Sequence, residues 1–483
     1  MTAAKTTARP LTGNDRFDVI VIGGGPAGIT AAVHAGMLGA KVALLDRRRL
    51  GGTCTNTGCV PTRVLAITAR LLRDIRGAAA YGIRVSEPTL DWGETVARVR
   101  QTIGNIGQLK RTPDKLRSLG GEVILEGSAA FQDAHTVKLA DTGRVLSAGH
   151  FILAVGGRAR RLPFPGAELA LTPDELTELA TLPRSVVIIG SGYTGVQVTT
   201  VLNAFGVAVT LLETLPRILP PADADVARTL RESFERQGIQ IVTGIGGVER
   251  LERGPDGTLR LTYTLGGQTR LLQTDAVMIA AGWPAATEGL GLEAAGVKVE
   301  RGFIEVNEQL QTSVPHIYAA GDANGRDMLV QGAVFEAELA AENAVRGTAQ
   351  PYTRMSLPSG GFTDPDHAGV GMTEQQARES GMNYAVAVAH YADLERAIID
   401  GRTTGFLKLV AEVPTGRIVG AHGTGENAVE VMQAVATAMS SGATAATLSA
   451  VRFAYPTYTA IVGEAARKLE LLLRQKESAG RTE

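Results

Sequence analysis

The chain has 483 residues, 44% of them hydrophobic, a length that suits two to four domains with filled cores. Its 48 Lys and Arg nearly balance its 49 Asp and Glu, so no long-range field is available to hold a polyanion. We therefore expect neither nucleic acid nor a membrane surface as a partner. No apolar run reaches the roughly 18 residues that a membrane span needs.

The N-terminal segment and the cysteine content bear on the compartment. Residues 1–16 are polar and rich in Thr and Ala, and they lack the apolar segment of a secretory signal, so we expect a disordered leader. Only two cysteines occur, whereas a secreted disulfide scaffold would carry more, at wider spacings. These features predict a cytoplasmic protein.

The first chemical motif is a βαβ unit. A buried strand at 18–22 runs into a glycine turn at 23–28, a helix follows over 29–38, and a strand at 41–45 ends at Asp46. A glycine turn between a strand and a helix is typical of a dinucleotide fingerprint, although one such turn also serves ordinary packing.

The three glycines of this turn have different duties in a fingerprint. Gly23 would make the turn, Gly25 would let the backbone approach a pyrophosphate, and Gly28 would let the helix pack closely on the strand. The helix N-terminus then faces the phosphates, and the acid at the end of the second strand, here Asp46, accepts hydrogen bonds from ribose hydroxyls.

The two cysteines follow directly, in GGTCTNTGCVPTR at 51–63. Cys54 and Cys59 can bridge only if the loop turns tightly, which Gly58 permits, and a helix starting here would lower a thiol pKa through its dipole. We expect a redox-active pair. A zinc site or two inert thiols are the alternatives, but zinc usually wants four ligands, and the chain has no other cysteine and seven scattered histidines.

The middle of the chain predicts helices at 64–79 and 95–119 and short strands at 122–131, 136–139 and 258–265. The tail from about residue 351 alternates strands, at 405–410 and 418–422, with a helix near 427–439, a pattern typical of an α+β domain.

Between these regions the βαβ pattern repeats. A strand at 185–189 enters the turn Gly190–Gly195, a helix runs to Phe205, and a strand at 208–212 ends at Glu213. The distance from first glycine to acid is 23 positions in both copies, close to the roughly 20 of the fingerprint. Gly190, Gly192 and Gly195 would repeat the three glycine duties. Two matched copies imply two dinucleotides.

Glu213 also indicates which nucleotide the second unit prefers. A carboxylate at this position would bond the ribose hydroxyls of NAD and repel the 2′-phosphate of NADP, so NAD(H) is favoured. Arg217, four positions on, could still reach a 2′-phosphate, and a solvated strand-end acid is the structural alternative for Glu213.

Taken together, these motifs resemble the class I pyridine nucleotide-disulfide oxidoreductases over about residues 17–470. The matching segments, in chain order, are GGGPAG at 23–28, GGTCTNTGCVPT at 51–62, FILAVGGRARRLPFPG at 151–166, GSGYTG at 190–195, QTSVPHIYAAGDAN at 311–324 and FTDPDHAGVGMTE at 362–374. The resemblance implies an α/β chain with two Rossmann-like dinucleotide-binding domains and a C-terminal α+β dimerisation domain, working as a homodimer.

The resemblance also implies domain limits and cofactors. FAD would bind residues 17–155 with 283–347, NAD(P)H would bind 156–282, and 348–483 would form the dimer. In the FAD domain it places Asp46 at the adenosine ribose, Asp322 near the ribityl or phosphate portion, and Gly52 and Thr53 at the cofactor.

The resemblance assigns roles near the reacting atoms as well. Cys59 resembles the flavin-proximal charge-transfer thiol, and Cys54 resembles the interchange thiol that meets the acceptor. Tyr193 resembles the gate that covers the flavin ring until nicotinamide arrives.

Two departures from the family pattern concern the chemistry. The acid-base dyad of His-Pro-Thr and a following Glu is replaced by Tyr455-Pro-Thr and Ala460, and an unperturbed phenol, with a pKa near 10, is a poor proton donor to a leaving thiolate. Tyr455 could equally be a packed interface aromatic. Second, Arg63 and Gln197 stand where Lys and Glu usually pair beside the flavin, so we expect a net positive site and a flavin potential raised by tens of millivolts.

The sequence thus predicts an FAD-dependent NAD(P)H oxidoreductase that passes electrons through Cys54 and Cys59 to a metal ion, a small disulfide or a similar soft electrophile, in the manner of a mercuric reductase. No metal-capturing N-terminal cysteine domain and no vicinal C-terminal cysteines are present, which argues against mercury itself. A diaphorase or quinone reductase is the alternative, and dihydrolipoamide dehydrogenase is placed last because the dyad is missing.

Overall fold

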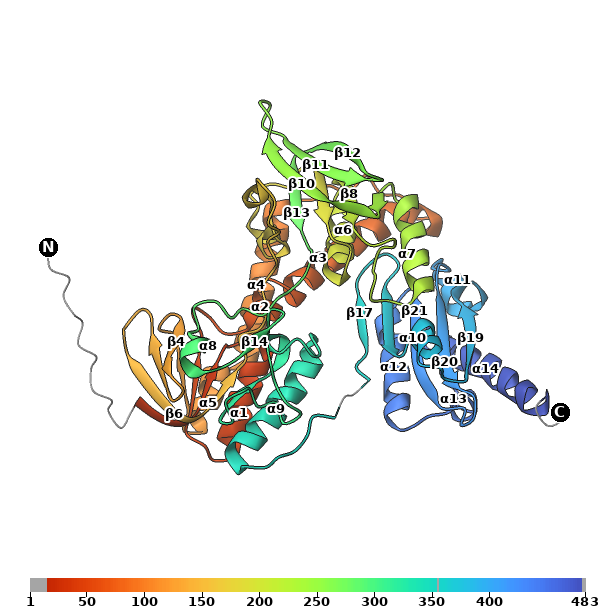
Figure 1. The fold of residues 1–483 in the computed structure, drawn as a ribbon. Coiled ribbons are helices and arrows are strands. Elements are labelled where there is room, and N and C mark those ends of the chain that lie inside the picture. Colours follow the sequence, from red (N-terminus) through yellow and green to blue (C-terminus); the bar gives the residue numbers. More distant parts are fainter. Residues whose placement is uncertain (1–14, 354–355, 480–483) are drawn as a thin grey trace. The chain divides into compact units, whose positions relative to one another are not determined.

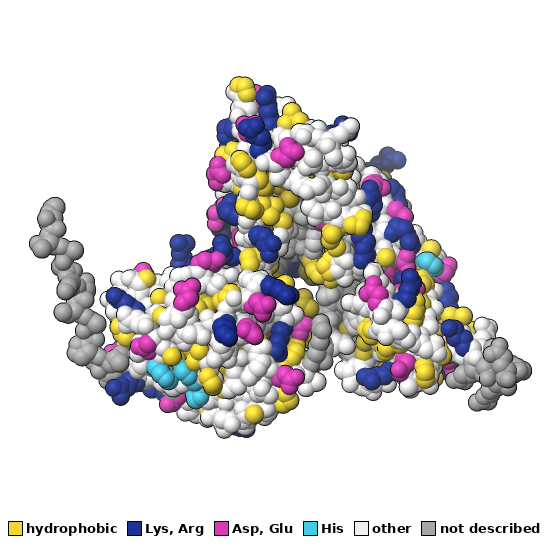
Figure 2. Space-filling model, in the orientation of Figure 1, with side chains coloured by type: hydrophobic (Ala, Val, Ile, Leu, Met, Phe, Trp, Pro, Cys, Tyr) yellow, Lys and Arg dark blue, Asp and Glu magenta, His cyan; other side chains and the backbone are white. Residues whose placement is uncertain are grey.

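The computed structural model describes residues 15–353 and 356–479, which divide into two compact units. Unit 1 comprises residues 15–64, 93–160 and 282–353, and unit 2 comprises 65–92, 161–281 and 356–479. Lys and Arg side chains are interspersed with Asp and Glu on the face drawn in Figure 2, in keeping with the balanced composition.

Unit 1 is built on a mixed sheet of seven strands. The strand order is β3-β2-β1-β6-β5-β4, with β16 also paired to β6, and the pairs among β1, β2, β3, β6 and β16 are parallel. Its strands are β1 (Arg16–Ile22), β2 (Val42–Leu45), β3 (Glu122–Ile124), β4 (Ala129–Asp133), β5 (Thr136–Leu139), β6 (Val145–Leu153) and β16 (Ile317–Ala319), beside the small β14 (Val299–Glu300) and β15 (Phe303–Ile304) ladder.

Two cores cover the two faces of this sheet. On one face the alanine-rich helices α1 (Pro26–Met37) and α9 (Val330–Arg346) pack side by side (Figure 1). The core on the other face includes side chains of α8 (Leu292–Ala295) and of the β4–β5 hairpin, which continues the sheet through the pairing of β5 with the start of β6. The remaining helices of unit 1 are α2 (Gly52–Asn56), the start of α3 (Cys59–Gly77), α4 (Trp92–Lys110, from residue 93 on), α5 (Thr112–Ser118) and the 3₁₀ turn η5 (Gly321–Ala323). Central parallel strands buried on both faces explain why β1 and β2 are almost continuously apolar.

Unit 2 repeats the parallel architecture in its first part. A four-stranded sheet has the order β13-β7-β8-β9, and an antiparallel sheet β10-β11-β12 shares its core. The elements are β7 (Ser185–Ile189), α6 (Tyr193–Ala204), β8 (Ala208–Glu213), α7 (Ala224–Arg236), β9 (Gln240–Thr243), β10 (Ile245–Arg253), β11 (Leu259–Leu265), β12 (Gln268–Thr274), β13 (Ala276–Ile279), η2 (Ala78–Tyr81), η3 (Ala167–Leu169) and η4 (Pro173–Glu178).

The second part of unit 2 is a five-stranded antiparallel sheet of order β17-β18-β21-β20-β19. Helices α12 (Ala428–Ser440), α13 (Ala445–Ser449) and α14 (Ala460–Ala479) share one apolar core with it (Figure 1). The other elements are β17 (Ser359–Gly361), β18 (His367–Gly371), α10 (Glu374–Glu379), β19 (Tyr384–His390), η6 (Tyr391–Asp393), α11 (Glu395–Ile399), β20 (Phe406–Glu412) and β21 (Ile418–Thr424).

Several elements differ from their predicted limits, among them the strand expected at 122–131, which is divided into β3 and β4. The helix expected at 95–119 is divided into α4 and α5, because Arg111 adopts a left-handed φ of 45° and Pro113 follows. The helix expected from residue 64 begins at Cys59. Most of the predicted leader lies outside the described residues, but Asp15, within the predicted leader, is buried and ion-paired to Arg144, and β1 begins at Arg16. The predicted three-domain limits stay a prediction.

Candidate active site

The glycine turn of unit 1 leaves no room for side chains at its first and third glycines. Gly23 has a φ of 110°, and a Cβ there would lie 2.2 Å from the carbonyl oxygen of Ala154. A Cβ on Gly28 would lie 1.7 Å from the carbonyl oxygen of Gly23. Helix α1 therefore packs directly on the turn, which aims its N-terminus at the carboxyl edge of the sheet.

The second glycine is different, because it faces open space. Gly25 is the N-cap of α1 and no side chain caps its helix, while a Cβ there would meet only the Cα of Gly52, at 3.7 Å. Gly52 itself approaches closely, since its own Cβ would lie 2.7 Å from the Cα of Gly25, and Thr53 is the next residue of α2. An uncapped helix end with a bare, glycine-lined approach fits the pyrophosphate of a dinucleotide such as FAD.

The acid of this unit keeps part of its hydrogen-bonding capacity. One Asp46 carboxylate oxygen accepts the Gly24 N–H at 2.7 Å, and the other accepts the Arg48 N–H at 3.2 Å. Because an ionised carboxylate offers about four acceptor positions and Asp46 is only partly buried, it retains capacity for a ribose.

Asp322 lies in η5, after β16 at the same carboxyl edge. Its carboxylate accepts the indole N–H of Trp283 at 3.0 Å. Burial raises the Asp322 pKa, and the Trp283 bond opposes that shift. The turn is held by the buried Glu336 of α9, which accepts the Gly321 N–H at 2.7 Å and the Asn324 amide at 2.8 Å, and burial raises the pKa of Glu336 to about 7.

The two cysteines lie in neighbouring helical segments. Cys54 is in α2, Cys59 is the first residue of α3, and Gly58 closes the turn between them by donating its N–H to the Thr53 carbonyl at 2.7 Å. Both are free thiols in this structure, Cys54 half-buried and Cys59 exposed. The tight turn that the sequence predicted is therefore present.

The thiols are electrostatically unequal. The Cys54 thiol hydrogen-bonds to Cys59, and this bond lowers the pKa of Cys59 to about 7, although the protein around the exposed residue partly desolvates its sulfur. The same bond, followed by burial and the neighbouring charge, raises the pKa of Cys54. The charge of Asp322 raises both pKa values, while Lys110, whose Nζ lies 3.4 Å from the Thr55 hydroxyl, acts in the opposite direction on Cys54. At neutral pH a large fraction of Cys59 is therefore thiolate, while Cys54 remains a thiol.

The turn of unit 2 reproduces the frame of unit 1. Gly190 has a φ of 102°, and a Cβ on Gly195 would lie 2.0 Å from the Gly190 carbonyl oxygen. Gly192 is the N-cap of α6, again without a side-chain cap, and a Cβ there would meet nothing within 4 Å. This second uncapped and open helix end fits the pyrophosphate of a nicotinamide dinucleotide.

The acid of unit 2 is more fully engaged than Asp46. Glu213 is 7% exposed and accepts four hydrogen bonds, from the Ser191 N–H and hydroxyl, the Leu215 N–H and the Thr214 hydroxyl. Burial raises its pKa, but these donors more than offset burial, so the net pKa is lowered. Glu213 is thus a buried anion rather than the solvated strand-end acid considered as an alternative. Arg217 donates to the Pro220 carbonyl at 2.8 Å.

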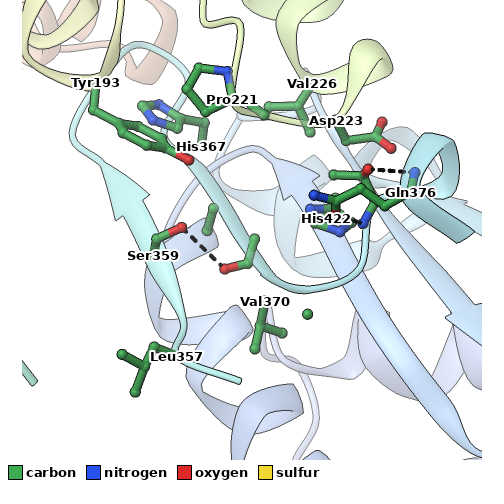
Figure 3. Close-up of a pocket in the computed structure, with 15 residues that line it drawn as sticks. Tyr193, Pro221, Asp223, Val226, Leu357, Ser359, His367, Val370, Gln376 and His422 are labelled. Atoms are coloured by element: carbon green, nitrogen blue, oxygen red, sulfur yellow. Dashed lines mark hydrogen bonds between the residues drawn. The ribbon is translucent and has the colours of Figure 1, made fainter. Parts of the chain in front are cut away.

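Tyr193, the predicted gate, stacks on a histidine that the sequence analysis passed over. The rings of Tyr193 and His367 lie 5.9 Å apart with an interplanar angle of 8° (Figure 3). His367 is 1% exposed, its Nδ1 lies 2.9 Å from the Thr363 hydroxyl, and burial lowers its pKa to about 4, so it is neutral at pH 7. Both rings line a cavity of about 140 Å³ within unit 2.

Gln197 joins α6, the helix that carries Tyr193, to the hairpin of β17 and β18, which carries His367. Its amide donates to the Tyr193 carbonyl at 3.0 Å and accepts the Phe362 N–H at 3.3 Å. Arg63 lies on α3, one turn after Cys59, in unit 1. The predicted meeting of Arg63 and Gln197 stays a prediction.

The dyad position holds no acid-base pair of its own. Tyr455 is 76% exposed, and Ala460 is the first residue of α14. In the described residues, no group of three or more His, Cys, Asp or Glu side chains is arranged so that it could hold a metal ion.

Three contacts escaped the sequence analysis: Trp283 on Asp322, His367 on Tyr193, and Lys110 beside Thr55. Each joins segments far apart in the chain, so residue spacing gave no signal. The only local hint was that His367 lies inside the FTDPDHAGVG segment that carries the resemblance.

Family models give the geometry its context. The model described as pyridine nucleotide-disulphide oxidoreductase matches residues 17–337, and the dimerisation-domain model of the same family matches 357–466. This chain belongs to that family. It therefore has two dinucleotide-binding domains and a C-terminal dimerisation domain, and its cofactors are FAD and a pyridine nucleotide, with NAD(H) favoured.

Relatives span nearly the whole chain. A dihydrolipoyl dehydrogenase of Chlorobaculum tepidum is 34% identical over 459 residues, covering 93% of this chain and 96% of that protein. One of Thermus scotoductus is 34% identical, covering 94% and 97%. A mercuric reductase of Bacillus cereus is 32% identical, covering 92% of this chain and 70% of that protein.

These relatives correct one ranking. The missing dyad placed dihydrolipoamide dehydrogenase last among the predicted activities, yet relatives of that name match a larger share of their own length than the mercuric reductase does. What the family establishes is a disulfide oxidoreductase. Separately, none of the described helices is long and apolar enough to cross a membrane.

Proposed function

We propose that this chain is an FAD-dependent NAD(P)H oxidoreductase that delivers two electrons to the Cys54–Cys59 pair and from there to a soft electrophile that needs no protein acid. The observation that carries the proposal is the unequal thiol pair, in which Cys54 donates a hydrogen bond to Cys59 and lowers its pKa to about 7. A thiol that is ionised at neutral pH is the reactive form.

When bound, FAD supplies the chemistry that takes a hydride from the nicotinamide and returns two electrons to a disulfide. The protein's own part begins at the thiols. Two electrons and one proton convert the Cys54–Cys59 disulfide into a Cys54 thiol and a Cys59 thiolate, which is the state described above.

Electrons then leave through sulfur chemistry. The proton of the Cys54 thiol passes to solvent, and the Cys54 sulfur then attacks an acceptor disulfide, breaks its S–S bond and releases one thiolate. The Cys59 thiolate attacks the Cys54 sulfur, which re-forms the Cys54–Cys59 bond and releases the second thiolate. A soft divalent metal ion would instead bind to the two sulfurs and take both electrons as they re-form the disulfide.

The dyad position restricts which acceptors can turn over. Tyr455 is largely exposed and Ala460 has no carboxylate, so neither matches the proton-donating pair of the family pattern. A leaving thiolate must then depart unprotonated, and thiolates of low pKa leave faster. Metal ions and activated disulfides are therefore favoured over alkyl disulfides such as lipoamide.

The names of the relatives support a second candidate, a dihydrolipoyl dehydrogenase. In a dihydrolipoyl dehydrogenase, Tyr455 or another group would have to donate a proton to the leaving thiolate fast enough for lipoamide to turn over. The two candidates share the thiol pair and differ in their dependence on the leaving group.

The test is a panel of disulfides graded by leaving-thiol pKa, from aromatic to alkyl, with lipoamide, mercuric and cupric ions and quinones, each assayed with NADH and NADPH. We expect rates to fall steadily as the leaving-thiol pKa rises. Tyr455→His with Ala460→Glu should raise the rates of alkyl disulfides and leave those of aromatic ones unchanged.

The same panel has two opposing outcomes. Equal rates for lipoamide and aromatic disulfides would select the dihydrolipoyl dehydrogenase. Quinone reduction that survives Cys54→Ser, with no turnover of disulfides or metal ions by the wild type, would select the diaphorase reading. We further propose a homodimer formed through residues 357–466 and a cytoplasmic location.

A further inference from the structure

The segment after β13 places a tryptophan on the cofactor side of unit 1. Backbone hydrogen bonds anchor this segment, from the Arg158 N–H to the Pro284 carbonyl at 2.9 Å and from the Ala286 N–H to the Gly156 carbonyl at 2.9 Å. Trp283 lies within it, partly buried, and its indole N–H donates to the Asp322 carboxylate at 3.0 Å. The backbone thus fixes the point from which the indole reaches Asp322.

Gly157 makes this placement possible. A Cβ at position 157 would lie 2.3 Å from both Cδ1 and Nε1 of the Trp283 indole, so the ring occupies the space that any side chain there would need. The hydrogen bonds of its segment therefore fix the backbone at Trp283, and the lack of a side chain at Gly157 leaves room for the indole.

The Asp322 carboxylate, which accepts this bond, lies in an environment that disfavours its negative charge. Burial disfavours the charged form of Asp322, and the described interactions that oppose burial are the Trp283 bond and a bond within the Asp322 residue itself. An ionised carboxylate only accepts hydrogen bonds, so an oxygen fixed by the indole leaves the other able to accept from a hydroxyl.

We propose that Trp283 is a positioning residue of the FAD site, which holds the Asp322 carboxylate in the orientation that receives a hydroxyl of the cofactor. The inference rests on the proposed assignment of Asp322 to FAD. Nothing in the fingerprints or in the thiol motif assigns a role to Trp283.

The test measures FAD affinity of the apoprotein by fluorescence titration. Trp283→Phe keeps an aromatic ring against Gly157 and removes the N–H donor, and it should raise the dissociation constant of FAD about tenfold, as expected for loss of a hydrogen bond to a charged group. Trp92→Phe is the matched control, because the Trp92 indole donates to the Leu179 carbonyl in unit 2, and it should leave the constant unchanged.

A pH series separates positioning from a general structural effect. Below pH 6.5 the Cys54 and Cys59 thiols and Glu336 are mainly protonated, so the negative charge that acidification removes beside the indole is that of Asp322, whose pKa is raised by burial. Because the indole bond favours the ionised form, Trp283→Phe should move the acid loss of FAD affinity to higher pH.

A second variant and a double variant keep the proposal open to refutation. Gly157→Ala, which displaces the indole without altering it, should weaken FAD binding as Trp283→Phe does. In an Asp322→Ala background, Trp283→Phe should have no further effect. If Asp322→Ala weakens FAD binding but Trp283→Phe does not, or strengthens it, the inference is wrong. If neither variant matters, the assignment of Asp322 to FAD is wrong too.

Discussion

The two glycine turns of this protein share one frame and differ in the acid that follows. In both, the third glycine lies against the carbonyl of the first, with a Cβ 1.7 Å away in unit 1 and 2.0 Å away in unit 2. In both, the second glycine opens onto free space at an uncapped helix. Asp46 accepts two protein hydrogen bonds, whereas Glu213 accepts four.

The difference separates two ways of selecting a nucleotide. A partly exposed Asp46 can accept from a ribose directly. Glu213 has its acceptor positions filled by the protein, so we expect it to act on the nucleotide chiefly through its buried negative charge, which would disfavour a 2′-phosphate. We therefore propose that the same position in the motif works by contact in one unit and by charge in the other.

The largest expected effect is on stability, and it separates the glycines that pack against backbone from those at the open helix ends. Gly28→Ala and Gly195→Ala push a methyl group into backbone, so each should destabilise the apoprotein by about 3 kcal/mol or more, measured by denaturant unfolding. Gly25→Ala and Gly192→Ala meet no such overlap.

Gly25→Ala and Gly192→Ala should leave apoprotein stability within about 0.5 kcal/mol of the wild type, while Gly25→Ala weakens FAD binding and Gly192→Ala weakens NADH binding. Equal loss of stability in all four variants would contradict the shared frame.

A smaller effect distinguishes the two acids. Glu213→Gln turns an amide group toward N–H and O–H donors, and it should lower the free energy of unfolding by about 1–3 kcal/mol at pH 7. Because the folded-state pKa of Glu213 is lowered, this contribution is present above pH 4.5 and is lost as the pH falls through the folded pKa.

Asp46→Asn is the counterpart. It should change unfolding less than Glu213→Gln does and should mainly weaken FAD binding, as judged by titration of the apoprotein. A larger stability loss in Asp46→Asn than in Glu213→Gln would overturn the distinction between the two acids.

Because both turns follow the fingerprint spacing, the positions of their strands, glycines and acids could be predicted from the sequence. Strand β7 has its predicted limits, and the glycines and both acids lie where the fingerprint spacing put them, because local chain geometry fixes a strand–turn–helix unit. The fully bonded state of Glu213 was not predictable, since it depends on Ser191, a residue the fingerprint leaves unspecified.

Features that depend on side-chain contacts could likewise not be predicted from the sequence. The helix expected from residue 64 starts at Cys59, which puts that thiol in a helical first turn, but the inequality of the thiols arises from a hydrogen bond between side chains. The stack of Tyr193 on His367 joins residues 174 positions apart in the chain, and nothing local announces it.

The smallest expected effect concerns the residue that follows the second glycine, Pro26 in unit 1 and Tyr193 in unit 2. His367→Val removes the stack, worth about 0.5–1.5 kcal/mol for an aromatic pair, so we expect the KM for NADH to rise roughly two- to tenfold with a smaller change in kcat.

His367→Phe should restore the wild-type KM. Because the pKa of His367 is about 4, the difference between His367→Val and wild type should not vary between pH 6 and 8. An unchanged KM in His367→Val would show that the stack does not order Tyr193.

The central claim is that electrons entering through the two dinucleotide units reach Cys54 and Cys59, with Cys59 as the thiolate. Anaerobic titration of the FAD-loaded protein with NADH tests it most directly. A long-wavelength absorbance band should appear in the wild type as two electrons are added. It should be present in Cys54→Ser before any NADH is added, because that variant has no disulfide to open, and it should fade on acidification and be absent in Cys59→Ser. A band that persists in Cys59→Ser, or no band in any of the three proteins, would contradict the account.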